Sequence, residues 1–231
     1  MKKIKDQHLL DYYIKKHKIN EIFENDMKSY MELVEFSRNE DILIAGNDMP
    51  YFYFIVDGKA KIYKTLENGK SVLIRFTRPL SELGSLELLQ KQRIVDSDVQ
   101  SLYGTICIRI SFDNLKVICD RDVTFYKYII DRLSHKLETS SKTATLNASY
   151  PFKNRFASYI ISITRIDEAN RIDEINFDKL TDLATFLGTS YRHLNRVIQN
   201  FEDEGIIKKE NKRFVILDYK KLETLAGGYY E

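Results

Sequence analysis

Residues 177–214 read FDKLTDLATFLGTSYRHLNRVIQNFEDEGIIKKENKRF, and this stretch decides the fold of the C-terminal part of the chain. Asp178 is a residue type that often caps a helix, and apolar residues then recur at helical spacing. Gly188 ends that helix, because glycine can take the left-handed conformation of a sharp exit. A second helix, capped by Thr189 or Ser190, follows directly, so the spacing predicts a helix-turn-helix. Its expected apolar positions are Leu180, Leu183, Ala184 and Leu187 on the first helix and Leu194, Val197, Ile198 and Phe201 on the second.

A two-stranded wing is expected after the second helix. Gly205 is followed by the run IIKK, a polar turn at residues 210–212 and the run RFVIL. Two short β-branched runs joined by such a turn are typical of a hairpin. The C-terminal domain is therefore predicted to be a winged helix-turn-helix.

The second helix predicts DNA binding. Polar side chains cluster near its N-terminus, where a helix in the major groove contacts base edges. Arg192 and Arg196 could each form a bidentate pair with guanine, and Asn195 or Gln199 could contact adenine. The alternative is a solvated polar face on an ordinary helical hairpin, while His193 lies on the apolar ridge and is expected to pack. The expected DNA-binding residues are Thr189, Ser190, Tyr191, Arg192, Asn195, Arg196, Gln199, Lys208, Lys209 and Lys212.

Composition is consistent with a local DNA-contacting face. The 231 residues, 43% hydrophobic and 30% charged, suffice for one large or two ordinary domains, and the formal net charge is only +2. No run of about 18 apolar residues occurs, so no membrane span is expected. The N-terminal residues lack the apolar core of a signal peptide, so a cytoplasmic location is expected. Cys107 and Cys119 provide neither a disulfide framework nor a metal-ligand spacing.

The first part of the chain changes from helical to strand-like patterning. Residues from about 6 to 30 have helical spacing, and short runs rich in β-branched and aromatic residues follow. Asp57-Gly58 and Asn68-Gly69 are expected to form hairpin turns, because these residue types tolerate positive φ. The pattern predicts an antiparallel sandwich or small barrel. The runs are LVEF, DILIAG, YFYFIV, KAKIYKT, SVLIRF, VDSDVQSL and TICIRIS.

A break interrupts these strands at PLSELGSLELL. Pro79 and Gly84 frame it, and the chain is expected to leave the sheet there for a short helical turn. Strand pairing is expected to resume near Val95, and the first domain to end near Ser111.

A long helix is expected from about Asp122, with apolar residues that alternate three and four apart, as in a coiled-coil seam. The alternative is one amphipathic helix packed on its own barrel, but the aromatic-rich barrel already has an interior. A two-fold dimer is therefore expected, which would place two recognition helices roughly 34 Å apart. The expected seam residues are Val123, Tyr126, Ile130, Leu133 and Leu137.

The predicted fold class is α+β. An N-terminal antiparallel β-roll or jelly-roll barrel with flanking helices is expected over residues 1–119, followed by a long dimerisation helix over 120–148. The winged helix-turn-helix domain is expected over 149–231, beginning with a helix after Pro151 and a strand-like segment at RIDEINF. Asp218 is expected to cap a last helix that ends at Gly227.

This order of elements resembles the CRP/FNR superfamily of bacterial transcription regulators. The elements are a barrel containing VDGKAKIYKTLENGKSVLIRF, a break, a long helix and a winged helix-turn-helix. The resemblance extends from about Leu33 to Leu217, and the run SYRHLNR is similar to the YeiL-type branch. It implies a homodimer that binds a roughly palindromic double-stranded DNA operator, senses a signal in the barrel and, if it is an activator, contacts RNA polymerase. It also implies that Arg196 contacts guanine. Arg192 stands where many members have glutamate, so operator preference should differ.

The resemblance also implies an effector site, but a cyclic nucleotide is not expected in it. Members that bind cyclic nucleotides use a glutamate for the ribose and an Arg-Ser pair for the phosphate. Glu82 and Arg93 fit this pattern, whereas Ile94 replaces the phosphate-binding serine, and a buried phosphate needs several donors. A less polar or differently charged ligand, or no ligand, is expected. The implied pocket residues are Glu82, Leu83, Arg93, Ile94, Ser140 and Ser141.

No other cofactor and no catalytic activity are expected. An iron–sulfur cluster needs four thiolates, and the chain has two cysteines. Haem and a cupin-like metal centre are not expected, because no histidine occurs between His17 and His135. The remaining alternative is a cyclic-nucleotide-like sensor that acts mainly by protein contact, which would not need Arg192 and Arg196 exposed together.

Overall fold

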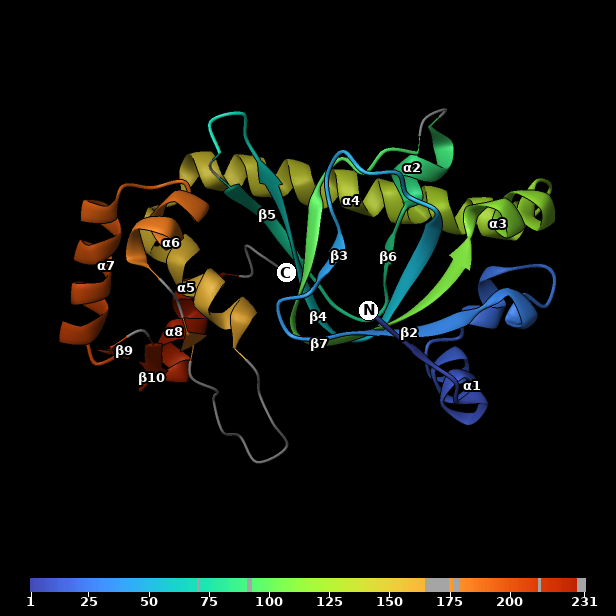
Figure 1. The fold of residues 1–231 in the computed structure, drawn as a ribbon. Helices are drawn as coiled ribbons and strands as arrows, with labels where there is room; N and C mark the ends of the chain where they lie inside the picture. The colour runs from blue at the N-terminus through green and yellow to red at the C-terminus, as the bar shows by residue number, and fades with distance from the viewer. Residues whose placement is uncertain (70, 91–92, 165–174, 177–178, 212, 228–231) are drawn as a thin grey trace. The chain divides into compact units, whose positions relative to one another are not determined.

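The computed structural model describes residues 1–69, 71–90, 93–164, 175–176, 179–211 and 213–227, excluding the side chains of residues 118, 142–149 and 175–176 (Figure 1). The chain forms two compact units. The first consists of Met1–Lys64 and Phe76–Ser140, and the second of Thr65–Arg75 and Ser141–Glu231. The long helix is thus not a separate segment between two domains. Its first part packs on the sheet of the first unit through Phe125 and Ile129, which are 1% and 0% exposed.

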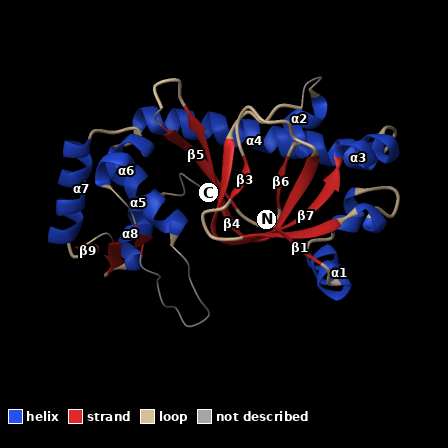
Figure 2. Ribbon diagram, viewed as in Figure 1, coloured by secondary structure: helices blue, strands red, loops and turns tan. Residues whose placement is uncertain are grey.

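The antiparallel sheet expected for the N-terminal part of the chain is present, and most of it belongs to the first unit. Its described strands follow the order β1-β2-β7-β4-β5, with β3 pairing with β7 and β6 pairing with β4 (Figure 2). The interior is rich in aromatic rings, among them Phe52, Phe54 and Phe112, each fully buried. The strands are β1 (Lys2–Ile4), β2 (Glu32–Phe36), β3 (Asp41–Leu43), β4 (Tyr51–Thr65), β5 (Ser71–Thr77), β6 (Ser81–Leu83) and β7 (Asp98–Ser111).

The prediction of a hairpin at Asp57-Gly58 is wrong. β4 continues through both residues, and its register with β7 shifts on either side of them, as at a β-bulge. Gly58 has φ +81°, and a Cβ there would overlap the carbonyl oxygen of Gly104. A positive-φ glycine serves a bulge as well as a turn, so local sequence does not separate the two. The prediction at Asn68-Gly69 is confirmed, because β4 and β5 are neighbours and Gly69 lies in their connection.

The expected break after Pro79 is only partly a break. Residues 81–83 form β6, which pairs with β4, so the chain stays in the sheet for three residues before helix α2 (Ser85–Leu89). Gly84 then has φ +107°, and a Cβ there would meet Met49, Phe112 and Phe52. Backbone pairing resumes near Val95, as expected, through an isolated antiparallel bridge between Ile94 and Asp48, and strand β7 begins at Asp98.

The N-terminal region is less helical than expected. Residues 2–4 form β1, helix α1 covers only Gln7–Lys16, and two short 3-10 turns follow at Ile19–Ile22 and Lys28–Tyr30. Lys18, with φ 52°, turns the chain between α1 and the first of them. The apolar residues that suggested one helix are buried against the sheet from several short elements instead.

Two helices complete the first unit: α3 (Phe112–Cys119) and the start of α4 (Val123–Ser149). Asp122 caps α4 by accepting from the Phe125 amide at 2.8 Å, and it also accepts from the Glu24 amide at 2.9 Å. Glu24 in turn accepts from the Thr124 amide at 3.3 Å, and the Phe23 and Phe125 rings stack 5.1 Å apart. The N-terminal region therefore holds the beginning of the long helix.

Within the second unit, the described residues from 152 to 226 form the predicted winged helix-turn-helix. The Phe156 ring lies 5.7 Å from Phe201 of α7 and 5.8 Å from Phe214 of β10, so one buried aromatic joins the second helix of the motif to the wing. β8, β10 and β9 form a three-stranded sheet in that order. The elements are α5 (Phe152–Ile163), β8 (Ile175–Asn176), α6 (Leu180–Phe186), α7 (Tyr191–Asp203), β9 (Ile207–Glu210), β10 (Arg213–Ile216) and α8 (Tyr219–Ala226).

Candidate nucleic-acid interface and the cluster around Glu82

The turn between α6 and α7 has the geometry that the sequence predicts. Gly188 follows α6 with φ 65°, and the Thr189 amide donates to the Ala184 carbonyl at 2.9 Å. Ser190 is the residue that caps α7, since its hydroxyl accepts from the His193 amide at 3.2 Å. Asp178, the expected cap of α6, lies outside the described residues, and the N-cap position is taken by Lys179.

Helix α7 has two sharply different faces. Its four predicted apolar residues are all buried, at 0–4% exposure. Arg192 and Arg196 are exposed, and among the described residues neither has an ion-pair partner. Acidic residues occur only at the other end of the helix, at Glu202 and Asp203. The exposed polar positions are Ser190, Tyr191, Arg192, Asn195, Arg196 and Gln199, while Thr189 is half-buried.

Two polar side chains of α7 have intramolecular partners. Gln199 donates to Asp203 at 3.1 Å, one turn further along the helix. The His193 ring lies 5.1 Å from Phe152 and its Nδ1 is 3.4 Å from the Thr189 hydroxyl. His193 is therefore packed and hydrogen-bonded, as its position on the apolar ridge indicates.

The wing lysines are not equivalent. Residues alternate between faces along a strand, so Lys208 and Lys209 point to opposite sides of the hairpin. Lys209 shares the side of Phe214, its cross-strand partner, and the Lys209 amide donates to Glu202 at 2.8 Å. Lys208 lies on the outer side and forms an ion pair with Glu210 at 2.8 Å. Lys212 lies outside the described residues.

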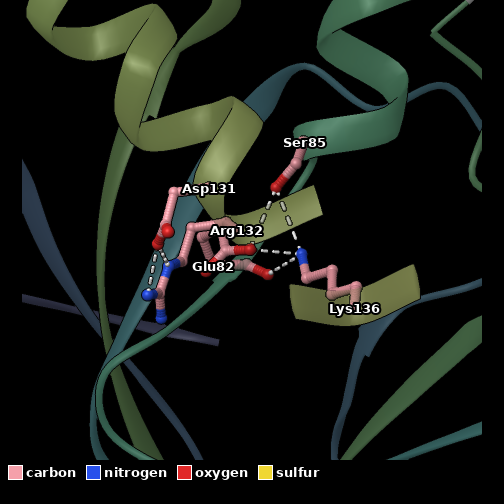
Figure 3. Close-up of polar contacts among 5 residues, drawn as sticks. All are labelled: Glu82, Ser85, Asp131, Arg132 and Lys136. Carbon is pink, nitrogen blue, oxygen red and sulfur yellow. Dashed lines mark hydrogen bonds and ion pairs between the residues drawn. The ribbon is translucent and has the colours of Figure 1, made fainter. Parts of the chain in front are cut away.

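In the first unit, Glu82 lies in a polar cluster that reasoning from sequence alone missed (Figure 3). This carboxylate is 2% exposed, forms an ion pair with Lys136 of α4 and accepts from the Ser85 hydroxyl at 3.2 Å. Lys136 also donates to the Glu82 carbonyl at 3.3 Å and to the Ser85 hydroxyl at 3.2 Å. Glu82 is thus neutralised by the chain itself. Beside it, Arg132 pairs with Asp131 at 2.7 Å.

Tyr128 lies near this cluster on α4. Burial, and then the Glu82 charge, raise the pKa of Tyr128 above its usual value. Its hydroxyl is buried and has no hydrogen-bond partner among the described residues. The tyrosine side chain therefore stays neutral. The Arg132 guanidinium lies over the Tyr128 ring, 5.6 Å from its centre, and this cation–π contact is favourable.

Arg93, the other charged residue of the implied effector pocket, has partners of its own. Arg93 donates to Asp113 at 3.3 Å, and its guanidinium lies 4.9 Å from the Phe112 ring centre. Leu83 is buried in β6, whereas Ile94 is 37% exposed. Ser140 and Ser141 are exposed. Glu82 and Arg93, the two residues that fit the nucleotide-binding pattern, therefore engage different groups, and the pocket itself remains a prediction.

The expected seam on α4 divides into two sets. Val123, Ile130 and Leu137, spaced by seven residues, are 55%, 62% and 73% exposed. Leu133 packs against the core of its own unit, and Tyr126 is half-buried. The first set forms an uncovered apolar stripe in the first unit, and the dimer seam itself stays a prediction.

Neither a membrane-spanning helix nor a metal-binding group of side chains is found among the described residues. None of their helices combines the length and the apolar character needed to cross a membrane. Their histidine, cysteine and carboxylate side chains form no group of three that could hold a metal ion. Cys107 and Cys119 are both buried, and burial raises the pKa of each thiol.

Comparison with known families places two matches on the chain. The profile of the Crp-like helix-turn-helix domain matches residues 154–225, which include both helices of the motif and the wing. The profile of the cyclic nucleotide-binding domain matches residues 33–122, which include β2 to β7. Together the two matches cover more than half of the chain.

Known relatives span most of the chain. It is 28% identical over 204 residues to regulatory protein YeiL of Escherichia coli O157:H7, covering 88% of this chain and 90% of the relative. It is 22% identical over 213 residues to transcriptional activator protein Anr of Pseudomonas aeruginosa, covering 89% and 86%. Among solved structures, a CRP/FNR-family transcriptional regulator from Thermus thermophilus matches with a TM-score of 0.67 at 21% identity, covering 85% and 98%.

Proposed function

Because the chain belongs to the CRP/FNR family of transcription regulators, we propose that it binds a palindromic DNA operator as a homodimer. The observation that carries this proposal is the division of α7 into a buried face and an exposed face with two unpaired arginines among the described residues. A helix of this kind fits the major groove with its first turns at the base edges.

Four exposed residues of α7, together with residues of the preceding turn and of the wing, have proposed roles. Arg196 and Arg192 contact guanine through O6 and N7, and Asn195 or Gln199 contacts adenine. Gln199 must first release Asp203, with which it shares a hydrogen bond. Ser190 and Thr189, at the helix N-terminus, hold a phosphate. Lys208 of the wing contacts the backbone, and Lys212 is proposed from the sequence alone.

The exposed stripe of Val123, Ile130 and Leu137 supports the homodimer. Three large apolar side chains at heptad spacing favour a second copy of the same helix as their partner. A two-fold dimer would present two recognition helices to half-sites centred roughly 34 Å apart, one turn of DNA.

We further propose that the sheet domain relays a signal without an iron–sulfur cluster or a cyclic nucleotide. The cluster does not fit, because the chain has only two cysteines and both are buried. The nucleotide is disfavoured because Glu82 is already paired with Lys136. A chain that acted only by protein contact would not need Arg192 and Arg196 exposed together, so that alternative is not favoured.

Activation is the proposed sign of regulation, and an activator would also contact RNA polymerase. The support is that one relative is a transcriptional activator protein. Transcription in vitro from a promoter that carries the selected operator tests this sign, because an activator increases the transcript and a repressor decreases it.

Selection of bound sequences from a random double-stranded DNA library tests the DNA-binding proposal. The full-length protein should enrich inverted half-sites with centres one helical turn apart. The same selection with cell extract added would show whether an effector changes the outcome. A library that yields no enriched sequence under either condition would contradict sequence-specific binding.

A further inference from the structure

The outer face of the wing carries a small charge network centred on a carboxylate. Lys208 and Glu210 are two residues apart on β9, so both point to the same side of the hairpin. Arg213 lies opposite Glu210 in the strand register. Glu210 forms an ion pair with Lys208 at 2.8 Å through one oxygen and with Arg213 at 2.7 Å through the other. One carboxylate therefore occupies two cations.

We propose that Glu210 competes with DNA phosphates for Lys208 and Arg213 and so limits the sequence-independent affinity of the wing. This inference rests on the DNA-binding function proposed above and concerns the same surface. Glu210 would then set the share of the DNA-binding free energy that comes from phosphate contacts rather than from base contacts.

The geometry favours competition over a fixed structural bond. The side chains of Lys208 and Arg213 are 61% and 39% exposed, so a phosphate can reach both cations. Exposed ion pairs of this kind contribute little to stability, so replacing the carboxylate with a phosphate costs little. Hydrogen bonding to Lys208 and Arg213 lowers the pKa of Glu210, so the carboxylate is charged at neutral pH and would repel an approaching phosphate.

The rest of the wing does not depend on this network. The inner side is held by Ile207 and Phe214, both fully buried, and by the Lys209 amide, which donates to Glu202 of α7. Replacing the Glu210 carboxylate with an amide should therefore leave the hairpin in place. The change would alter charge and hydrogen bonding on the outer face alone.

The test compares wild type with Glu210→Gln, using fluorescence anisotropy on the selected operator and on random DNA over a range of salt concentrations. Glu210→Gln should increase the affinity for the operator and for random DNA severalfold and by the same factor. The plot of log affinity against log salt should steepen by about 1 to 2, because each phosphate neutralised contributes about 0.9. Glu223→Gln, an exposed position of α8 with the same charge change, is the control and should have a smaller effect.

A second comparison isolates the mechanism. In a Lys208→Gln, Arg213→Gln background, Glu210→Gln should no longer steepen the salt dependence, because the two cations that it frees are gone. Unchanged affinity and slope for Glu210→Gln would overturn the proposal, and so would a changed ratio of operator to random binding, which would mean that Glu210 contacts a base. If wild type binds no DNA, the proposed function fails as well; if wild type depends on Arg196 but not on Glu210, only this inference fails.

Discussion

Lys136 of α4 forms an ion pair with Glu82 of β6, and the carboxylate is 2% exposed (Figure 3). The pair joins the long helix to the sheet, with Ser85 of α2 as a third member. Removing one partner of a buried pair leaves an uncompensated charge, whereas replacing both can be nearly neutral. The cluster therefore fixes the rotation of α4, with Lys136 facing the sheet and Leu137 facing outward.

Lys136→Met should destabilise the protein by up to about 3–5 kcal/mol, because Glu82 would remain buried without a counter-ion. Glu82→Gln combined with Lys136→Met should recover most of that loss. The free energy of unfolding of each variant in urea measures the effect. Lys127→Met, an exposed position of the same helix, is the control and should stay within about 0.5 kcal/mol of wild type. If the single and double variants lost the same free energy of unfolding, the Glu82–Lys136 ion pair would contribute nothing to stability.

Cyclic AMP and cyclic GMP should give no binding heat at sub-millimolar concentration, and neither should change operator affinity. A ribose hydroxyl would have to displace Lys136 from Glu82, and a phosphate would have to draw Arg93 away from Asp113. Isothermal titration of the full-length protein, followed by operator binding with each nucleotide, measures both effects. Micromolar binding that Arg93→Ala abolishes would restore the nucleotide-sensing interpretation.

Leu137→Asp should convert the proposed dimer to a monomer at micromolar concentration. Leu137 is 73% exposed, so the charge costs little in a monomer but several kcal/mol if it is buried in an interface. Sedimentation equilibrium gives the mass. Ile44→Asp, an exposed apolar position in the loop after β3, is the control and should leave the dimer intact. If the wild-type protein were already monomeric at this concentration, the proposed dimer through α4 would be wrong.

Most of the helix-turn-helix could be predicted from the sequence because its signals are local. Gly188, the cap at Ser190 and the apolar spacing of α7 each depend on neighbours within a few residues, and all three agree with the structure. Asp57-Gly58 shows the opposite case. Both a hairpin and a bulge need glycine at positive φ, and only the partner strand β7 decides which one forms.

The polar cluster at Glu82 depends on contacts between residues far apart in sequence. Lys136 follows the buried Ile129 by seven residues, which places it on the sheet-facing side of α4. A lysine in that register indicates a buried acidic partner, but the sequence does not say which one. The pairing at Glu210 was equally hidden, because it depends on the register of β9 with β10.

Arg196→Ala should cost roughly 1–3 kcal/mol at the preferred operator and relax the preference for guanine at one position per half-site. The reason is that a bidentate contact to a base edge is lost while phosphate contacts remain. Affinity for the operator and for versions with each half-site guanine replaced measures the loss. In the Glu210→Gln background, where Lys208 is free of its carboxylate partner, Lys208→Ala should instead weaken operator and random DNA alike and reduce the salt dependence, since a phosphate contact carries no sequence information. Equal weakening of operator and random DNA by Arg196→Ala would mean that Arg196 contacts the backbone, and base reading would then have to be assigned to Arg192, Asn195 or Gln199.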